Sequence, residues 1–230
     1  CGGHPVGGGH PTSVRERPVI PIGGGLSSRL PVTCCQSDGS PMRETLISVD
    51  VETAGPNPSS YSMLSIGACH IDDPAIGFYV ELAPVNDAIT TEALSIGGLT
   101  LEHLRDTGRD PAEAMLEFEA WLGATVPAEH DPVLVGFNAA FDWMFVCDYF
   151  ERFLGRNPFG HSAIDIKSYY LGMAGGSWAE TSLRFLSPQY LDGQELSHNA
   201  LGDARDQAVL FSAISRDERR NPRKKKRRTT

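Results

Sequence analysis

The sequence predicts an α/β fold built on a five-stranded mixed sheet, with the first three strands antiparallel and helices on both faces. Three observations support this prediction. Residues 46–53 alternate between apolar and polar side chains, which is the period of a β-strand. Two further strand-like segments follow after short turns. The rest of the chain alternates amphipathic helical segments with short apolar runs, an order that places helices against a sheet.

The antiparallel half comes first in the chain. Ile47, Val49 and Val51 face one side of the first strand, and the polar residues between them face the other side. Residues 56–60 contain only proline, asparagine and serine, which are typical of a turn. The three strands are expected at residues 46–53, 63–71 and 77–82.

Helices dominate the second half. Asp110 is suited to cap a helix that has Pro111 at its first position. Aromatic residues recur every four residues from Phe141 to Phe153, which gives a helix one aromatic face. We expect helices from Pro111 onward and at residues 139–154, 167–172, 178–185 and 200–215, with short strands at residues 132–136 and 162–166.

The 230 residues suit one domain with two flanking segments. Residues 1–42 contain nine glycines and six prolines without a sustained period, and we expect them to be disordered. Residues 43–215 form the predicted domain. Residues 216–230 hold nine basic and two acidic residues, and we expect a disordered basic tail there.

The net charge of −9 combines this tail, at +7, with a remainder of the chain at −16. An acidic body does not hold nucleic acid through a diffuse coat of lysine and arginine. An anionic substrate would therefore have to be held locally, by metal ions in a cleft. The basic tail would add only a weak contact that salt weakens further.

The sequence also bears on the cellular compartment. No apolar run reaches the ~18 residues needed to span a bilayer, and the first residues lack the order of a signal peptide. The five cysteines form neither a Cys-x-x-Cys pair nor a zinc-like cluster. We expect free thiols, a cytoplasmic location and no membrane partner.

Carboxylates from two distant segments are candidates for a metal site. Asp50 and Glu52 are two residues apart on a strand, so both leave the same face, roughly 6.6 Å apart along the chain, and can share one hard cation. Asp142 lies four residues after Asn138, where a strand gives way to a helix, so both can point into one cleft. The simpler alternatives are two solvated acids on a strand and an asparagine that caps the helix.

His198 and Asp203 are the third pair. On a regular helix five residues separate two side chains by about 140°, which would keep them apart. They converge only if His198 lies in the loop before a helix and Asp203 lies in its first turns. A histidine in a loop is suited to accept a proton from water. The alternative is a surface histidine and an aspartate stabilised by the helix dipole. Together the three pairs favour a two-metal phosphodiesterase.

The chain resembles the DEDDh branch of the DnaQ-like (ribonuclease T-like) 3′–5′ exonucleases over roughly residues 44–215. Residues 49–55, 138–142 and 198–204 are similar to the three motifs of that branch, in the same order. The segments 64–68 and 89–100 resemble the second strand and a connecting segment of the family. The related tyrosine branch places Tyr where Asn199 stands.

The resemblance implies a ribonuclease H-like fold and two divalent cations, Mg²⁺ or Mn²⁺. It implies that Asp50 bridges both ions and that Glu52 and Asp203 complete the ion beside the nucleophile. Asp142 would support the ion beside the leaving group. His198 would deprotonate the attacking water.

Two more residues are implied to contact the terminal nucleotide, Thr53 and Asn138. The chain departs from the family at Phe137, where histidine is frequent, and at Ser65, where an acid is frequent. Neither position binds metal in the family. These departures therefore concern the subfamily rather than the chemistry.

The predicted function is hydrolysis of terminal phosphodiester bonds of single-stranded DNA or RNA from the 3′ end, with release of 5′-mononucleotides. One alternative is a phosphoaspartate-type phosphatase, because Asp50-x-Glu52 is one methylene away from the Asp-x-Asp that begins the Asp-x-Asp-x-Thr loop of that class. A second is a non-catalytic nucleic-acid-binding module that uses residues 223–228. The sequence leaves open whether DNA or RNA is the substrate, whether the protein is a homodimer, and whether a polymerase or repair protein is its partner.

Overall fold

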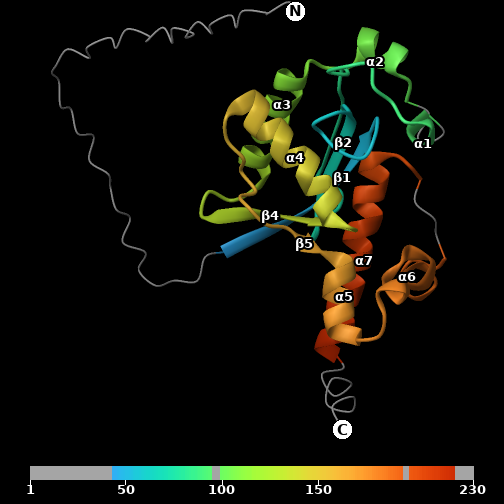
Figure 1. Cartoon of the computed structure of the whole chain (residues 1–230). Coiled ribbons are helices and arrows are strands. Elements are labelled where there is room, and N and C mark those ends of the chain that lie inside the picture. The colour runs from blue at the N-terminus through green and yellow to red at the C-terminus, as the bar shows by residue number, and fades with distance from the viewer. Residues whose placement is uncertain (1–42, 95–98, 194–196, 221–230) are drawn as a thin grey trace, which may run out of the picture. The chain divides into compact units, whose positions relative to one another are not determined.

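The computed structural model describes residues 43–94, 99–193 and 197–220 (Figure 1). These residues form a five-stranded mixed sheet with helices packed on both faces, which confirms the predicted fold class. The segment predicted to be disordered at residues 1–42 and the last ten residues of the basic tail lie outside the described residues.

The strand order in the sheet is β3-β2-β1-β4-β5. β1 pairs antiparallel with β2, and β2 pairs antiparallel with β3, as predicted. β4 runs parallel to β1, and β5 runs parallel to β4. The bounds are Arg43–Thr53 for β1, Met63–His70 for β2, Gly77–Glu81 for β3, His130–Gly136 for β4 and Ile164–Asp165 for β5. β1 is the central strand, so both of its edges are paired.

The helices follow the predicted order with three differences. The bounds are Thr91–Leu94 (α1), Leu101–Thr107 (α2), Pro111–Thr125 (α3), Ala139–Leu154 (α4), Ile166–Ala174 (α5), Leu183–Tyr190 (α6) and Ala200–Arg220 (α7), with a 3₁₀ helix η1 at Trp178–Thr181. The short helices α1 and α2 were not predicted. The single helix predicted at residues 178–185 is wrong, because Ser182 is extended (φ −69°, ψ 153°) and separates η1 from α6.

The predicted boundary of the basic tail is also corrected. α7 continues through Arg220, five residues beyond the end predicted at residue 215. Its last turns contact α6, where the Tyr190 hydroxyl donates to Asp217 Oδ2 at 3.5 Å. Arg216 Nε donates to the Ser212 carbonyl at 3.0 Å within the helix. These contacts extend the helix past the end of its apolar pattern.

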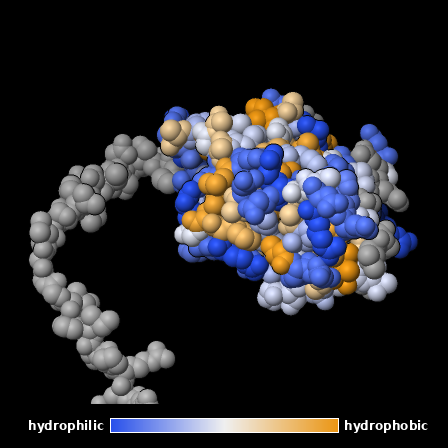
Figure 2. All heavy atoms as spheres, turned by 90° about the horizontal axis from the view of Figure 1, so that it is seen from above, coloured by the Kyte–Doolittle hydropathy of each residue, from blue (hydrophilic) through white to orange (hydrophobic). Residues whose placement is uncertain are grey.

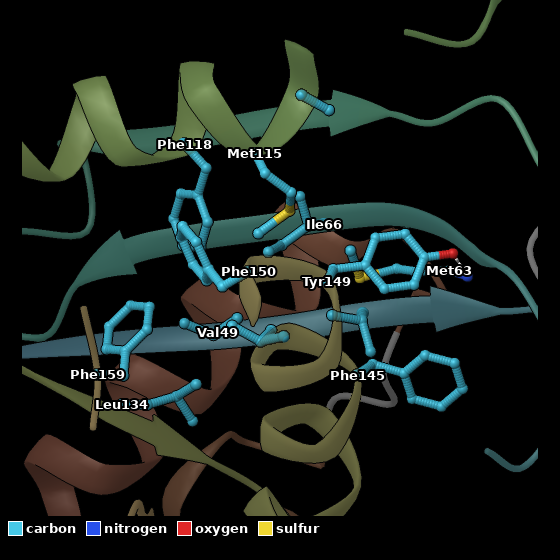
Figure 3. Close-up of a cluster of buried hydrophobic side chains, with 14 of the residues drawn as sticks. Val49, Met63, Ile66, Met115, Phe118, Leu134, Phe145, Tyr149, Phe150 and Phe159 are labelled. Carbon is cyan, nitrogen blue, oxygen red and sulfur yellow. Dashed lines mark hydrogen bonds between the residues drawn. The ribbon is translucent and has the colours of Figure 1, made fainter. Parts of the chain in front are cut away.

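One face of the sheet packs against α3 and α4. Ile47, Val49 and Val51 of β1 all point into this core, as the strand alternation predicted. Aromatic rings from both helices fill the space above the strand (Figure 3). Buried Tyr149 is also a polar link, because its hydroxyl accepts a hydrogen bond from Met63 N at 2.7 Å.

The opposite face of the sheet packs against α7, which crosses β1 and β2 (Figure 1). Gly67 of β2 allows this contact to be unusually close. A Cβ on Gly67 would lie 2.2 Å from the carbonyl carbon of Ala200, the first residue of α7. Only glycine therefore fits where the start of α7 touches the sheet.

The described part of the chain has a mixed surface and helices of limited hydrophobicity. Seen from above, hydrophobic side chains form separate groups between hydrophilic areas (Figure 2). Among the described residues, no helix has both the length and the hydrophobicity needed to cross a membrane. Cys69 and Cys147, the two cysteines in this part of the chain, are free thiols.

Candidate active site

A cavity of about 530 Å³ opens at the carboxyl end of β1, between α4 and the start of α7. The strand register explains why distant segments meet there. Ser48 of β1 pairs with Val135 of parallel β4, so the chain leaves both strands at the same edge of the sheet. All seven residues singled out from the sequence line this cavity: Asp50, Glu52, Thr53, Asn138, Asp142, His198 and Asp203.

Asp50 and Glu52 lie on the face of β1 that α7 covers. Asp50 pairs with Gly67 across the sheet, and Glu52 pairs with Ser65, one residue before a register shift in the strand. Alternation along the strand places both carboxylates on the same side, as predicted. Glu52 remains partly exposed to the cavity.

Asp142 reaches the same cavity from the first turn of α4. Its side chain is 4% exposed, and its Oδ1 accepts a hydrogen bond from Val51 N at 3.2 Å. This bond runs from the backbone between Asp50 and Glu52, so it ties α4 to the acidic strand.

Asn138 precedes α4 in a left-handed conformation, with φ 71° and ψ 42°. It occupies the N-cap position of the helix, but its side chain makes no capping hydrogen bond. Asparagine tolerates the left-handed region better than most residues. Asn138 lines the cavity, and its backbone is held in an uncommon conformation at the start of the helix.

His198 and Asp203 meet as their prediction required. His198 lies in the segment before α7 with φ 56°, and Asp203 lies in the first turn of the helix. Asp203 is 3% exposed, and its carboxylate accepts from Ser197 N at 2.7 Å and from His198 N at 3.0 Å. Asn199 caps the helix by accepting from Gly202 N at 3.0 Å.

These contacts bring the segment of His198 and Asp203 close to Glu52 of β1. A ring nitrogen of His198 and carboxylate oxygens of Glu52 and Asp203 lie within 4.8 Å of one another. The ring of His198 is exposed, while Asp203 is buried. The two carboxylate oxygens fit a divalent cation at this spacing, and the ring nitrogen lies beside them.

The acids repel one another in this site. Burial raises the pKa of Asp50 well above its ordinary value, and the charges of the neighbouring acids raise it further. Burial is also the main cause that raises the pKa of Asp142 to about 8. The pKa of Glu52 is raised by burial and by the charge of Asp203, against the opposing effect of His198. Carboxylates in this condition favour protons or cations as neighbours.

Thr53 is at the rim of the cavity, and its hydroxyl is already engaged. Thr53 Oγ1 donates to the Gly55 carbonyl at 2.9 Å, which stabilises the turn after β1. The oxygen keeps lone pairs with which it can accept a hydrogen bond from a ligand.

Gln207 is a site residue that the sequence did not reveal. Its side chain is 2% exposed. Nε2 donates to Asp50 Oδ1 at 2.6 Å, and Oε1 accepts from Phe137 N at 2.8 Å. The one available signal was its position four residues after Asp203, on the same face of α7. Gln207 thus fixes Asp50 and the end of β4 to one helix.

Asp165 is a structural carboxylate beside the site. Its Oδ1 accepts from Ser168 N at 2.7 Å and caps α5. Its Oδ2 accepts from Ala139 N at 2.9 Å, at the start of α4. Both oxygens therefore hold backbone around the site.

The geometry agrees with the comparisons to known proteins. A family model described as Exonuclease (RNase T) matches residues 47–211. The chain is 44% identical over 174 residues to an Escherichia coli protein named 3′-5′ DNA exonuclease Cap18, covering 76% of this chain and 93% of that protein. It is 30% identical over 179 residues to ribonuclease T of Shewanella baltica, covering 72% of this chain and 79% of that protein.

Solved structures show the same fold at lower identity. An E. coli exonuclease I–single-stranded DNA complex in its zinc-bound form superposes with a TM-score of 0.59 and 20% identity, covering 80% of this chain. The chain spans 42% of the length of that exonuclease. The nuclease domain of 3′hExo, a DEDDh family member bound to rAMP, gives a TM-score of 0.58 at 13% identity, covering 78% of this chain and 93% of that domain. The chain belongs to the exonuclease family whose model it matches.

Proposed function

We propose that the protein is a metal-dependent 3′–5′ exonuclease that shortens single-stranded nucleic acid and releases 5′-mononucleotides. The observation that carries this proposal is the meeting of His198 with four carboxylates from three segments in one cavity. The relative at 44% identity is named a DNA exonuclease, so single-stranded DNA is the first substrate to test and RNA the second.

The donor set suits two divalent cations, Mg²⁺ or Mn²⁺. Four carboxylates supply hard oxygen ligands. Burial, together with the charges of neighbouring acids, raises the pKa of Asp50, Glu52 and Asp142. We assign Asp50 to both cations, Glu52 and Asp203 to the one beside the nucleophile, and Asp142 to the other. When bound, the cations would supply a more acidic water and neutralise charge on the phosphodiester.

We assign proton transfer and nucleotide binding to side chains of the cavity. His198 is exposed and adjacent to Glu52 and Asp203, so its ring can take a proton from water held between them. Asp203 holds the backbone of His198 and thereby positions the ring. We propose that the Asn138 amide and the Thr53 hydroxyl contact the terminal nucleotide, because both line the cavity.

The test uses single-stranded DNA and RNA labelled at either the 3′ or the 5′ end, with Mg²⁺ or Mn²⁺. The 3′ label should leave first as a mononucleotide, and the 5′ label should give a ladder of shortened strands. Asp203→Asn and His198→Ala should each reduce the rate by about 100-fold or more. Asp206→Asn, the same change three residues along α7 and outside the cavity, should retain activity.

Three outcomes would contradict the proposal. Retained activity in Asp203→Asn or His198→Ala would remove the assigned site, provided that both variants melt near the wild-type temperature. Release of the 5′ label first would reverse the polarity. A trapped phosphoaspartate at Asp50 would favour the phosphatase alternative.

We also propose that the enzyme acts in the cytoplasm, where free thiols such as Cys69 and Cys147 persist.

A further inference from the structure

A short row of cationic and aromatic side chains leads away from the cavity. It consists of Phe137, Lys167 and Trp178, and we call it the rim row. Phe137 lines the cavity itself. The Lys167 ammonium lies 5.8 Å from the centre of the Phe137 ring and 4.3 Å from the centre of the Trp178 ring. A cation therefore sits between the wall of the cavity and an indole outside it.

Lys167 is an unusual residue in this part of the chain. It is the single lysine within residues 43–220, a strongly acidic stretch. The four ion pairs found among the described residues all use arginine. Lys167 has no carboxylate within ion-pair distance in the described part of the chain, and it contacts aromatic rings instead. Its charge is therefore available to an anion that approaches the rim.

Trp178 is 52% exposed, the largest exposed fraction among the large hydrophobic residues of the described chain. Its position is nevertheless well defined. Thr181 is fully buried and its hydroxyl donates to the Trp178 carbonyl at 2.8 Å. Ser177 and Glu180 form a capping box around the same turn. The turn thus holds a large aromatic surface in solvent at a fixed place beside Lys167.

Nearby acids would oppose a bound phosphate, and the two closest in sequence are engaged. Asp165, two residues before Lys167, gives both oxygens to backbone N–H groups. Glu180 Oε2 accepts from Ser177 N at 2.7 Å. Their charges are partly offset by helix-terminal N–H groups. Lys167 therefore supplies the positive charge of the rim row, beside two acids whose oxygens are already engaged.

We propose that the rim row is a subsite for the single strand just upstream of the 3′-terminal nucleotide. Lys167 would contact a backbone phosphate, and a base would stack on the indole of Trp178. This inference rests on the proposed function, because it requires a nucleic-acid 3′ end in the cavity. Stacking on one exposed ring needs an unpaired base and tolerates any base, so the subsite selects single strands without reading sequence.

The subsite should affect binding of a long strand but not hydrolysis of a substrate with a single nucleotide. The probes are a single-stranded DNA 12-mer and the p-nitrophenyl ester of thymidine 5′-monophosphate, which contains one nucleotide and cannot reach the rim. Trp178→Ala should raise the KM for the 12-mer by about 5- to 100-fold with little change in kcat. Hydrolysis of the ester should stay within about twofold of the wild-type rate.

Lys167→Met should raise the KM for the 12-mer and also change its response to salt. Loss of one phosphate contact should reduce the slope of log(kcat/KM) against log[salt] by about 0.7. Lys167→Arg and Trp178→Phe should largely restore the KM, because they keep the charge and the ring. Matched controls are Arg43→Met, at the far end of β1, and Leu116→Ala, 50% exposed on α3 over the opposite face of the sheet.

The outcomes distinguish this inference from the proposed function. If the wild type hydrolyses neither probe, the proposed function fails. If it hydrolyses both and the rim variants keep the wild-type KM for the 12-mer, the subsite is refuted alone. An equal loss on the 12-mer and the ester would also refute it, because that pattern indicates a disturbed cavity. Should Trp178→Ala fail to fold, the salt slope of Lys167→Met decides the question.

Discussion

Replacing Gln207 with leucine tests whether an amide on α7 holds the acidic site together. Leucine keeps a similar volume in a position that is 2% exposed, but it removes both hydrogen bonds. The bond to Asp50 is 2.6 Å long, and the bond from Phe137 N is 2.8 Å long. After the change Phe137 N–H has no partner in a crowded region, and Asp50 loses the donor that lowers its pKa.

The loss of stability and the loss of metal affinity can both be estimated. A buried group left without its hydrogen bond costs about 1–3 kcal/mol. In a domain of this size that cost corresponds to a fall in melting temperature of roughly 2–12 °C. Loss of a group that orients a metal ligand typically weakens metal affinity or activity about 10- to 100-fold. The concentration of Mn²⁺ that gives half-maximal exonuclease rate should rise by that factor.

The assay is a Mn²⁺ titration of exonuclease activity together with a thermal melt. Gln189→Leu is the matched control, because Gln189 is exposed on α6 and its side chain donates to the Phe185 carbonyl, away from the cavity. A Gln207→Leu enzyme with the wild-type half-saturating Mn²⁺ concentration would refute the positioning role. A lower melting temperature with unchanged Mn²⁺ dependence would leave Gln207 a purely structural residue.

Three further predictions follow from the same contacts. Asn138→Gly should keep the left-handed backbone and the melting temperature but lower kcat/KM, whereas Asn138→Ala should lower both; equal kcat/KM in Asn138→Gly and wild type would exclude a substrate contact. Gly67→Ala should displace the start of α7 and lower both activity and melting temperature, while Gly123→Ala, with open space around it, should not; comparable melts of the two variants would contradict the packing argument. Carboxyls whose pKa is raised in the folded state contribute stability that is complete below roughly pH 4 and is lost as the pH rises through about 8. The melting temperature of the metal-free protein should therefore fall with increasing pH. Mn²⁺ should raise the melting temperature most at alkaline pH. Asp142→Asn should flatten that dependence, and a melting temperature in EDTA that rises with pH would show the sign to be wrong.

The sequence was most informative where local rules decide the structure. Alternation along β1 placed Val49 in the core and Asp50 in the cavity without knowledge of any partner. The His198–Asp203 condition was also local, because it depended only on where α7 begins. These rules, with the resemblance in three motifs, were enough to predict the strand order of the first half and seven of the residues that line the cavity.

Other features depended on contacts between distant segments. β5 has only two residues, and it is a strand because β4 lies beside it. Gln207 has an ordinary helical sequence environment, and its role arises from two partners 157 and 70 residues away. Ser182 has no proline or glycine beside it to indicate a break between η1 and α6. Patterns within a short window contain no information on such contacts.

Asp203 has two duties in one side chain, since it faces the cavity and also accepts the backbone N–H groups of Ser197 and His198. His198, the proposed proton acceptor, and Asp203 therefore cannot be changed independently of each other. Anyone who retunes this nuclease, for example to change its preferred cation, would alter the placement of the imidazole in the same step. A redesign of the cavity has to treat the segment from Ser197 to Asp203 as one inseparable unit.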